Sequence, residues 1–304
     1  MLPIKKKLLW LLLLPIAAIG AGGAMFLYSP AFLVDSVDRV ASRSDVKKIA
    51  QDIKFGPHPG NKLDIYSTAA KGRQLKPVLV FFYGGGWANG KRGEYSYAAR
   101  PFVENGYIVV IPDYRHVPEV VFPGFLVDSA AAVKWVQANI EQYGGDPAQV
   151  NVAGHSAGAY NATMLAIDPQ WLGDKPVRSA ISLAGPADFY PFTSKRAIDA
   201  MSDAPDPLAT QPITFVRKDA PPIMLIHGTK DTVVRIRNAD SLYAKQTAAG
   251  GIIERRRYKG AKHDDLVLSL STLFRSRYPV VRDSIEFLNN HNRLPQATIT
   301  QQVK

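Results

Sequence analysis

The chain has 304 residues, 46% of them hydrophobic, which is enough apolar material for one large domain or two small ones. It has no cysteine, so disulfides, thiol catalysis and zinc–thiolate sites are excluded. The formal net charge is +11, but the sequence shows no run of five like charges and no aromatic–basic repeat, so we expect a solvated basic surface and no nucleic-acid partner.

Residues 1–28 are predicted to form a targeting segment. Lysines occupy positions 5–7, and the next 21 residues, 8–28, are uncharged, a pattern typical of a secretory signal peptide. The run is long enough to cross a membrane and continues past the small residues Gly23 and Ala24, which favours an uncleaved membrane anchor over cleavage there. We therefore expect an exported protein, either anchored at the periplasmic side of the inner membrane or, if cleaved, periplasmic or secreted. A buried helix is the alternative.

Beyond a predicted polar spacer at 29–48, strands and helices alternate through residues 49–292, and 293–304 form a polar tail. DIKF and KLDIYS flank GPHPGN, which predicts an antiparallel hairpin. Alternation of strands and helices predicts an α/β fold with a mostly parallel central sheet and helices on both faces. A proline-rich stretch at 188–221 predicts a short cap insertion. The remaining expected strands are KPVLVFFY, YIVVIPDY, QVNVAG, AISLAG, PIMLIHG and IIERRRYKG, and helices are expected in FLVDSAAAVKWVQANIEQYGG, at 237–248 and at 279–290.

The candidate nucleophile is Ser156, in the pattern Gly-x-Ser-x-Gly of NVAGHSAGAY. This pattern lies between a predicted strand and a predicted helix, where a sharp turn pushes the serine out of the sheet and leaves room only for glycine on each side. The helix N-terminus then favours negative charge developing beside the serine. The alternative is that Ser156 is only an N-cap.

Serine needs a general base, and six histidines compete for that role. His263 follows the last predicted strand, so it should reach the same carboxyl-terminal edge of the sheet as Ser156. His155 adjoins the serine, but the turn should direct its side chain elsewhere. The others are less suitably placed: His58, His116, His227 and His291.

An acid must hold the histidine in the correct tautomer and balance its charge when it is protonated. Asp231, in HGTKDTVV, follows the fifth buried strand and is the candidate. Asp188, which follows the fourth, is the rival. Asp264 and Asp265 are too close in sequence to His263 to approach its ring readily.

The glycine run in FFYGGGWANG is predicted to contribute to an oxyanion hole. Attack on a carbonyl creates an oxyanion that needs donors already in place. Gly84, Gly85 and Gly86 follow an early strand and expose backbone N–H groups, and Ala157 can give its own N–H. On its own, the glycine run could equally be only a turn.

Together YGGGW, PDYRHVPEVVFPGFLVDSAAAVKWV, YGGDPAQVNVAGHSAGAY, IHGTKDTVV and YKGAKH resemble the α/β-hydrolase carboxylesterases. The similarity covers roughly residues 53–290 and is greatest to the hormone-sensitive-lipase-like esterases and the bacterial feruloyl-esterase and kynurenine-formamidase-like branch. The resemblance implies an α/β-hydrolase catalytic domain at 49–292, with no cofactor and no metal. It implies the triad Ser156, Asp231 and His263, with oxyanion donors on Gly85, Gly86 and Ala157.

The chain departs from these families at Tyr83, where they usually have a histidine that braces the glycine loop. We expect the tyrosine hydroxyl to brace the loop in its place. Gly84, Trp87 and His155 are expected to brace the loop or to line the substrate site. The resemblance also suggests that three further residues form structural networks beside the site: Asp113, Arg115 and Asp128.

Three functions follow from these observations. The first is a serine hydrolase acting on small-molecule carboxylic esters. The second is an amidase or formamidase with the same triad, because the sequence does not show how a leaving amine would be protonated. The third is a membrane-tethered interaction protein on an inactive scaffold, which is disfavoured because such scaffolds usually lack a triad residue.

Overall fold

The computed structural model describes residues 30–42, 44–68 and 74–292. The predicted targeting segment at 1–28 and the predicted tail at 293–304 therefore lie outside the described residues. Within the described part of the chain, no helix combines the length and apolar character needed to span a membrane.

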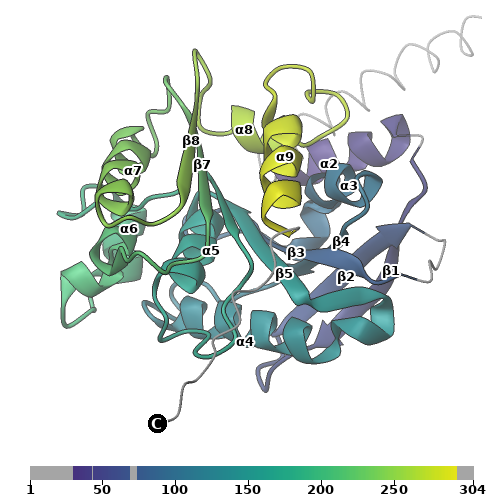
Figure 1. Cartoon of the computed structure of the whole chain (residues 1–304), viewed down its shortest axis with the longest axis horizontal. Coiled ribbons are helices and arrows are strands. Elements are labelled where there is room, and N and C mark those ends of the chain that lie inside the picture. Colours follow the sequence, from purple (N-terminus) through teal and green to yellow (C-terminus); the bar gives the residue numbers. More distant parts are fainter. Residues whose placement is uncertain (1–29, 43, 69–73, 293–304) are drawn as a thin grey trace, which may run out of the picture.

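The described strands form an 8-stranded sheet in the order β1-β2-β4-β3-β5-β6-β7-β8 (Figure 1). β1 pairs antiparallel with β2 and β2 antiparallel with β4, whereas every pairing from β4 to β8 is parallel. The prediction of a mostly parallel α/β sheet with an antiparallel hairpin at its start is therefore confirmed. The strands are β1 Val46–Lys54, β2 Lys62–Thr68, β3 Lys76–Phe82, β4 Ile108–Pro112, β5 Gly145–His155, β6 Ala180–Leu183, β7 Ile223–Gly228 and β8 Ile253–Tyr258.

Helices cover both faces of this sheet (Figure 1). α3 and α9 contact each other on one face, and α4 and α5 contact each other on the other. β4, β6 and β7 are buried along their whole length because both of their faces are covered. The α-helices are α2 Pro30–Ala41, α3 Ser96–Glu104, α4 Gly124–Asn139, α5 Ala157–Ile167, α6 Lys195–Met201, α7 Arg237–Ala248, α8 Asp265–Leu268 and α9 Val280–Asn292.

The segment expected to be a polar spacer at 29–48 is instead part of the folded body. It forms α2 and the start of β1. Two of its acidic residues are not solvated: Asp35 and Asp38 are buried, and Asp38 lies 2.6 Å from Nε of Arg100 on α3. The expectation failed because buried carboxylates that have a partner look, in sequence, the same as exposed ones.

The expected cap at 188–221 lies between β6 and β7 and contains the short helix α6. Ala197, Ala200 and Met201 bury one side of α6, and the Ser194 side chain caps its first turn. Two 3-10 helices follow, η3 Pro207–Thr210 and η4 Pro212–Phe215. The insertion is therefore short and held against the body.

Candidate active site

Ser156 occupies a sharp turn between β5 and α5. Its backbone has φ 54° and ψ −120°, a region that residues other than glycine rarely adopt. A Cβ on Gly154 would lie 2.3 Å from the backbone of Gly158, and a Cβ on Gly158 would lie 2.1 Å from the carbonyl oxygen of Phe82. Both glycines are therefore required by close backbone contacts. The Ser156 side chain makes no capping bond to α5, so the structure does not support the N-cap alternative.

The structure brings Ser156, His263 and Asp231 into one hydrogen-bonded chain. The Nε2 atom of His263 lies 2.9 Å from Oγ of Ser156, and its Nδ1 lies 2.8 Å from Oδ2 of Asp231. In the neutral ring, Nδ1–H donates to the carboxylate, which leaves Nε2 free to accept the serine proton. The three residues come from the ends of β5, β7 and β8, which meet at one edge of the sheet, as expected from the sequence.

Asp231 is fixed by its own contacts. Its Oδ1 accepts hydrogen bonds from the backbone N–H groups of Val233 and Val234, each at 2.9 Å. Burial by itself would raise the pKa of Asp231, but hydrogen bonds from His227 and His263 outweigh burial and hold this pKa well below its usual value. The carboxylate therefore stays ionised.

The backbone of the rival acid, Asp188, is bonded to Asn238. Its backbone N–H donates to Oδ1 of Asn238 at 2.9 Å. No hydrogen bond or ion pair joins Asp188 to His263 in the part of the chain that the structure describes. His227, one of the histidines less suitably placed to be the base, has its Nε2 atom 3.3 Å from Oδ2 of Asp231 and 2.7 Å from the carbonyl oxygen of Val234.

The backbone N–H groups of Gly85, Gly86 and Ala157 are free to bind a ligand. Among the described residues, none of the three donates a hydrogen bond to a protein acceptor. Ala157 is the first residue of α5, where N–H groups have no partner within the helix. Backbone N–H groups without a protein acceptor are the kind of donor that binds the negative oxygen of a tetrahedral intermediate.

Each glycine of the loop is required for a different reason. A Cβ on Gly84 would lie 2.9 Å from Nδ1 of His155 and 3.3 Å from Cβ of Ser156, so this residue lies directly beside the candidate nucleophile. Gly85 has φ +138°, and its Cβ would lie only 2.0 Å from the carbonyl oxygen of Asn89. Gly86 has φ +63°. The loop therefore turns sharply and presents free N–H groups at the same time.

Tyr83 points into the core, away from the surface. Its ring is fully buried and stacks on Tyr95 and Tyr114, at ring-centroid distances of 5.3 Å and 4.9 Å. Its hydroxyl donates to Oδ1 of Asp113 at 3.0 Å. The residue is therefore placed to brace the glycine loop and does not line the substrate site.

Arg92 was not identified from the sequence, although it binds Asp113, the residue that accepts the hydrogen bond of the Tyr83 hydroxyl. Its backbone N–H donates to Oδ1 of Asp113 at 2.8 Å, and its guanidinium contacts Asp113, Asp64 and Asp52. The three carboxylates come from separate segments, so no local sequence pattern links them to the arginine. The pair expected beside the site, Arg115 and Asp128, forms two side-chain hydrogen bonds of 2.8 and 3.0 Å.

Trp87 lies in an aromatic cluster under the cap. Its ring is 4% exposed and stacks on Phe125 and Phe189, and its Nε1–H donates to Oδ1 of Asn161 at 3.3 Å. Phe189 belongs to the 188–221 segment, so the cluster joins the glycine loop to the cap.

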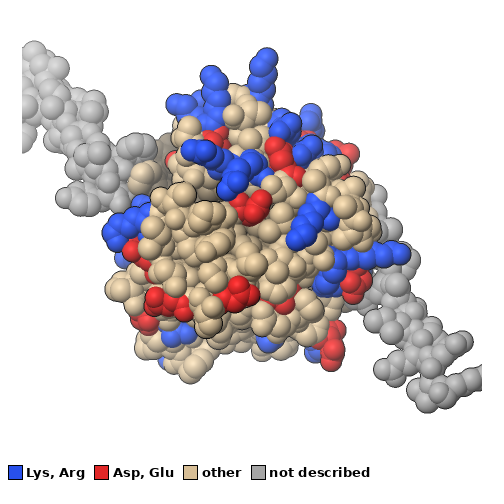
Figure 2. Space-filling model, turned by 90° about the vertical axis from the view of Figure 1, so that its left-hand side faces the viewer, with Lys and Arg blue, Asp and Glu red and all other residues tan. Residues whose placement is uncertain are grey.

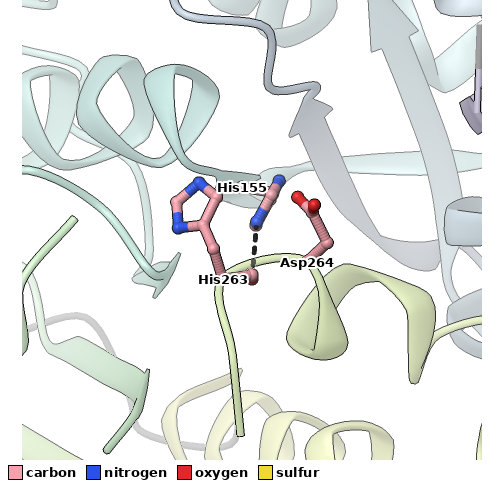
Figure 3. Close-up of side chains that lie close together, drawn as sticks. All are labelled: His155, His263 and Asp264. Carbon is pink, nitrogen blue, oxygen red and sulfur yellow. Dashed lines mark hydrogen bonds between the residues drawn. The ribbon is translucent and has the colours of Figure 1, made fainter. Parts of the chain in front are cut away.

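His155, His263 and Asp264 form a group whose ligand atoms lie within 4.8 Å of one another (Figure 3). Both ring nitrogens of His263 are already bonded to Ser156 and Asp231, and Nε2 of His155 lies 3.1 Å from the carbonyl oxygen of His263. A metal bound there would displace the contacts that align the base. Burial, together with the nearby His263, lowers the pKa of His155 to about 3, so His155 is neutral at ordinary pH.

Comparisons with known proteins identify the family of the chain. The family model BD-FAE matches residues 63–246. Esterase LipQ of Mycobacterium tuberculosis (strain ATCC 25618 / H37Rv) is 34% identical over 207 residues, which are 60% of this chain and 49% of LipQ. Esterase LipC of the same strain is 27% identical over 219 residues, 64% of this chain and 54% of LipC. The chain thus spans about half the length of these curated relatives.

A solved structure shows the same fold. Esterase B from Lactobacillus rhamnosis aligns with a TM-score of 0.75 at 18% identity, over 91% of this chain and 96% of that chain. The predicted α/β-hydrolase fold is therefore confirmed.

Proposed function

The chain belongs to the BD-FAE family, and from this membership we propose that it is a serine hydrolase that cleaves carboxylic esters of small molecules through an acyl-enzyme intermediate. The observation that carries the proposal is the hydrogen-bonded chain Ser156–His263–Asp231 beside the free N–H groups of Gly85, Gly86 and Ala157. The relatives LipQ and LipC are both named esterases, which supports the same reaction class.

In the first half of the reaction, Oγ of Ser156 attacks the ester carbonyl while Nε2 of His263 takes the serine proton. Asp231 stabilises the imidazolium that forms, because its carboxylate accepts the Nδ1–H hydrogen bond at 2.8 Å. The carbonyl oxygen becomes an oxyanion, which the free N–H groups bind. Collapse of the intermediate expels the alcohol, which receives its proton from His263, and leaves an acyl group on Ser156.

In the second half, water takes the place of serine. His263 removes a proton from the water as it attacks the acyl carbonyl, and the same donors bind the second oxyanion. The acid is then released, and Ser156 recovers its proton from His263. No cofactor is needed, because in each half His263 gives up the proton that it has accepted, first to the alcohol and then to Ser156.

Two measurements test the proposal. A fluorophosphonate probe should label the wild-type protein and fail to label Ser156→Ala, because the probe reacts with an activated serine. A panel of matched aryl esters and aryl formamides should then show faster turnover of the esters. Absence of labelling in folded protein would support a non-catalytic protein, and faster turnover of the formamides would support an amidase.

We also propose that the protein is exported and held at the membrane by residues 1–28. The lysines at 5–7 and the uncharged run at 8–28 support this proposal. Cell fractionation with tagged protein tests it: recovery of the intact chain in the soluble cytoplasmic fraction would contradict export.

A further inference from the structure

Arg196 extends from α6 over the glycine loop. A Cβ on Gly86 would lie 2.5 Å from Cδ of Arg196 and 3.3 Å from its Nη1. The stem of the arginine therefore rests on the backbone that carries the candidate oxyanion donors. The absence of a side chain on Gly86 is what leaves space for this contact.

The guanidinium of Arg196 has no partner within the described part of the chain, where it forms no ion pair, hydrogen bond or ring contact. The side chain is exposed. Its neighbour Lys195 differs, because Nζ of Lys195 lies 2.7 Å from a carboxylate oxygen of Asp199. Arg196 thus presents five N–H donors and a permanent charge that the protein does not neutralise.

The base of Arg196 is nevertheless fixed. Ala197, Ala200 and Met201 anchor α6, and the backbone N–H of Phe122 donates to the carbonyl oxygen of Ala200 at 2.8 Å. A fixed base reduces the entropy that the side chain loses when it binds an anion. Arg196 on α6 is therefore better suited to bind an anion than an arginine on an unconstrained surface loop would be.

Further unpaired basic side chains lie on the loops that carry the other triad residues. Figure 2 shows Lys and Arg gathered toward the top of the face that carries α6 and α7, the level at which β8 ends in Figure 1. The loop of His263 also carries one exposed acidic residue, Asp264, beside these basic side chains. Within the described ranges, four exposed basic residues on the loops directly after β7 and β8 form no ion pair: Lys230, Arg235, Lys259 and Lys262.

We propose that Arg196 binds a carboxylate on the substrate, so that the enzyme prefers esters that carry a second, ionised acid group; this inference rests on the proposed ester hydrolysis. A guanidinium binds a carboxylate through two parallel hydrogen bonds, which also orient the bound molecule. The basic residues after β7 and β8 attract the anion from a distance, and Arg196 holds it beside Ser156.

Two matched pairs of esters test the proposal. In the first pair, nitrophenyl glutarate and nitrophenyl pentanoate differ by a carboxylate on the acyl part. In the second, carboxyphenyl butyrate and phenyl butyrate differ by a carboxylate on the alcohol part. For each pair, the quantity measured is the ratio of kcat/KM for the charged ester to that for the neutral ester.

In Arg196→Gln, we expect this ratio to fall about tenfold in at least one pair, mainly through KM. Arg196→Lys should keep part of the preference, because the charge remains but the paired geometry is lost. Lys195→Gln is the matched control and should keep the wild-type ratio. Added salt should lower the wild-type ratio through screening. Equal ratios in wild type and Arg196→Gln for both pairs would overturn the proposal.

A binding measurement separates this inference from the proposed function. Monomethyl glutarate, with its carboxylate on the acyl part, and carboxyphenyl butyrate, with its carboxylate on the alcohol part, are titrated into Ser156→Ala protein by calorimetry, with and without Arg196→Gln. If no ester is hydrolysed, weaker binding caused by Arg196→Gln would still support the carboxylate site. If Arg196→Gln leaves the binding of both probes unchanged, the carboxylate site is rejected, whatever the outcome for hydrolysis.

Discussion

Replacing His155 by glutamine should remove part of the pH dependence of folding stability. Burial lowers the pKa of His155 from the usual 6.5 to about 3, so the folded protein excludes a proton that the unfolded chain binds. The free-energy cost of excluding this proton from the folded protein is negligible above pH 6.5. It grows as the pH falls and stops growing near the pKa of His155 in the folded state. Because the folded form binds fewer protons in this window, acid destabilises the protein through this residue.

The size of the effect follows from the shift. Each pKa unit corresponds to about 1.4 kcal/mol, and between about pH 7 and pH 5 the unfolded histidine becomes almost fully protonated. Exclusion of that proton from the folded state costs about 2 kcal/mol over this interval. Glutamine does not titrate, and its side-chain amide can still donate toward the carbonyl oxygen of His263, which lies 3.1 Å from Nε2 of His155.

Urea unfolding at the two pH values provides the assay. The free energy of unfolding of the wild type should fall by about 2 kcal/mol more than that of His155→Gln between about pH 7 and pH 5. The free energy of unfolding should fall with urea concentration at the same slope in both proteins, because the same surface is exposed on unfolding. An equal fall in both proteins would show that His155 takes up a proton in the folded state, and the reasoning from burial would be wrong.

Steady-state kinetics on a short aryl ester tests five further substitutions. Ser156→Ala should lower kcat by about 10⁴-fold in protein with an unchanged circular dichroism spectrum, because the attacking atom is lost, and substantial activity would reject the nucleophile. Asp231→Asn should also be severe, whereas Asp188→Asn should have little effect; the reverse order would reject the assigned acid. Gly85→Val should cost about 10²–10³ in kcat by displacing a donor, and an unaltered kcat would mean that the loop only turns the chain. Tyr83→Phe should cost about 1 kcal/mol in stability or transition-state binding, as for one hydrogen bond, and no change in either would refute the brace.

Much of the sheet was predictable because its strands are continuous apolar runs, a direct consequence of burial on both faces. The triad positions could be predicted for a related reason. Ser156, Asp231 and His263 each follow a strand, and the carboxyl ends of parallel strands meet at one edge. The position of a residue directly after a predicted strand therefore limited the candidates for the triad to a few.

Features that depend on packing between distant segments were not predictable. The sequence suggested that Gly85 exposes its N–H group, but it did not show that a side chain at this position would collide with the carbonyl oxygen of Asn89. Arg196 has no distinguishing local pattern, and its contact with Gly86 depends on how the cap folds over the loop. Asp38 looked like part of a polar linker because its partner, Arg100, lies 62 residues away in sequence.

The docking of α2 sets a boundary for any shortened form of the protein. α2 begins at Pro30, two residues after the predicted targeting segment. Deletion of 1–28 would preserve the pair between Asp38 and Arg100, whereas a start at residue 49, directly after the predicted spacer, would leave the buried Arg100 without its carboxylate. Loss of one partner from a buried pair typically costs about 3–5 kcal/mol. A soluble version intended for crystallisation or kinetics should therefore begin at or before Pro30.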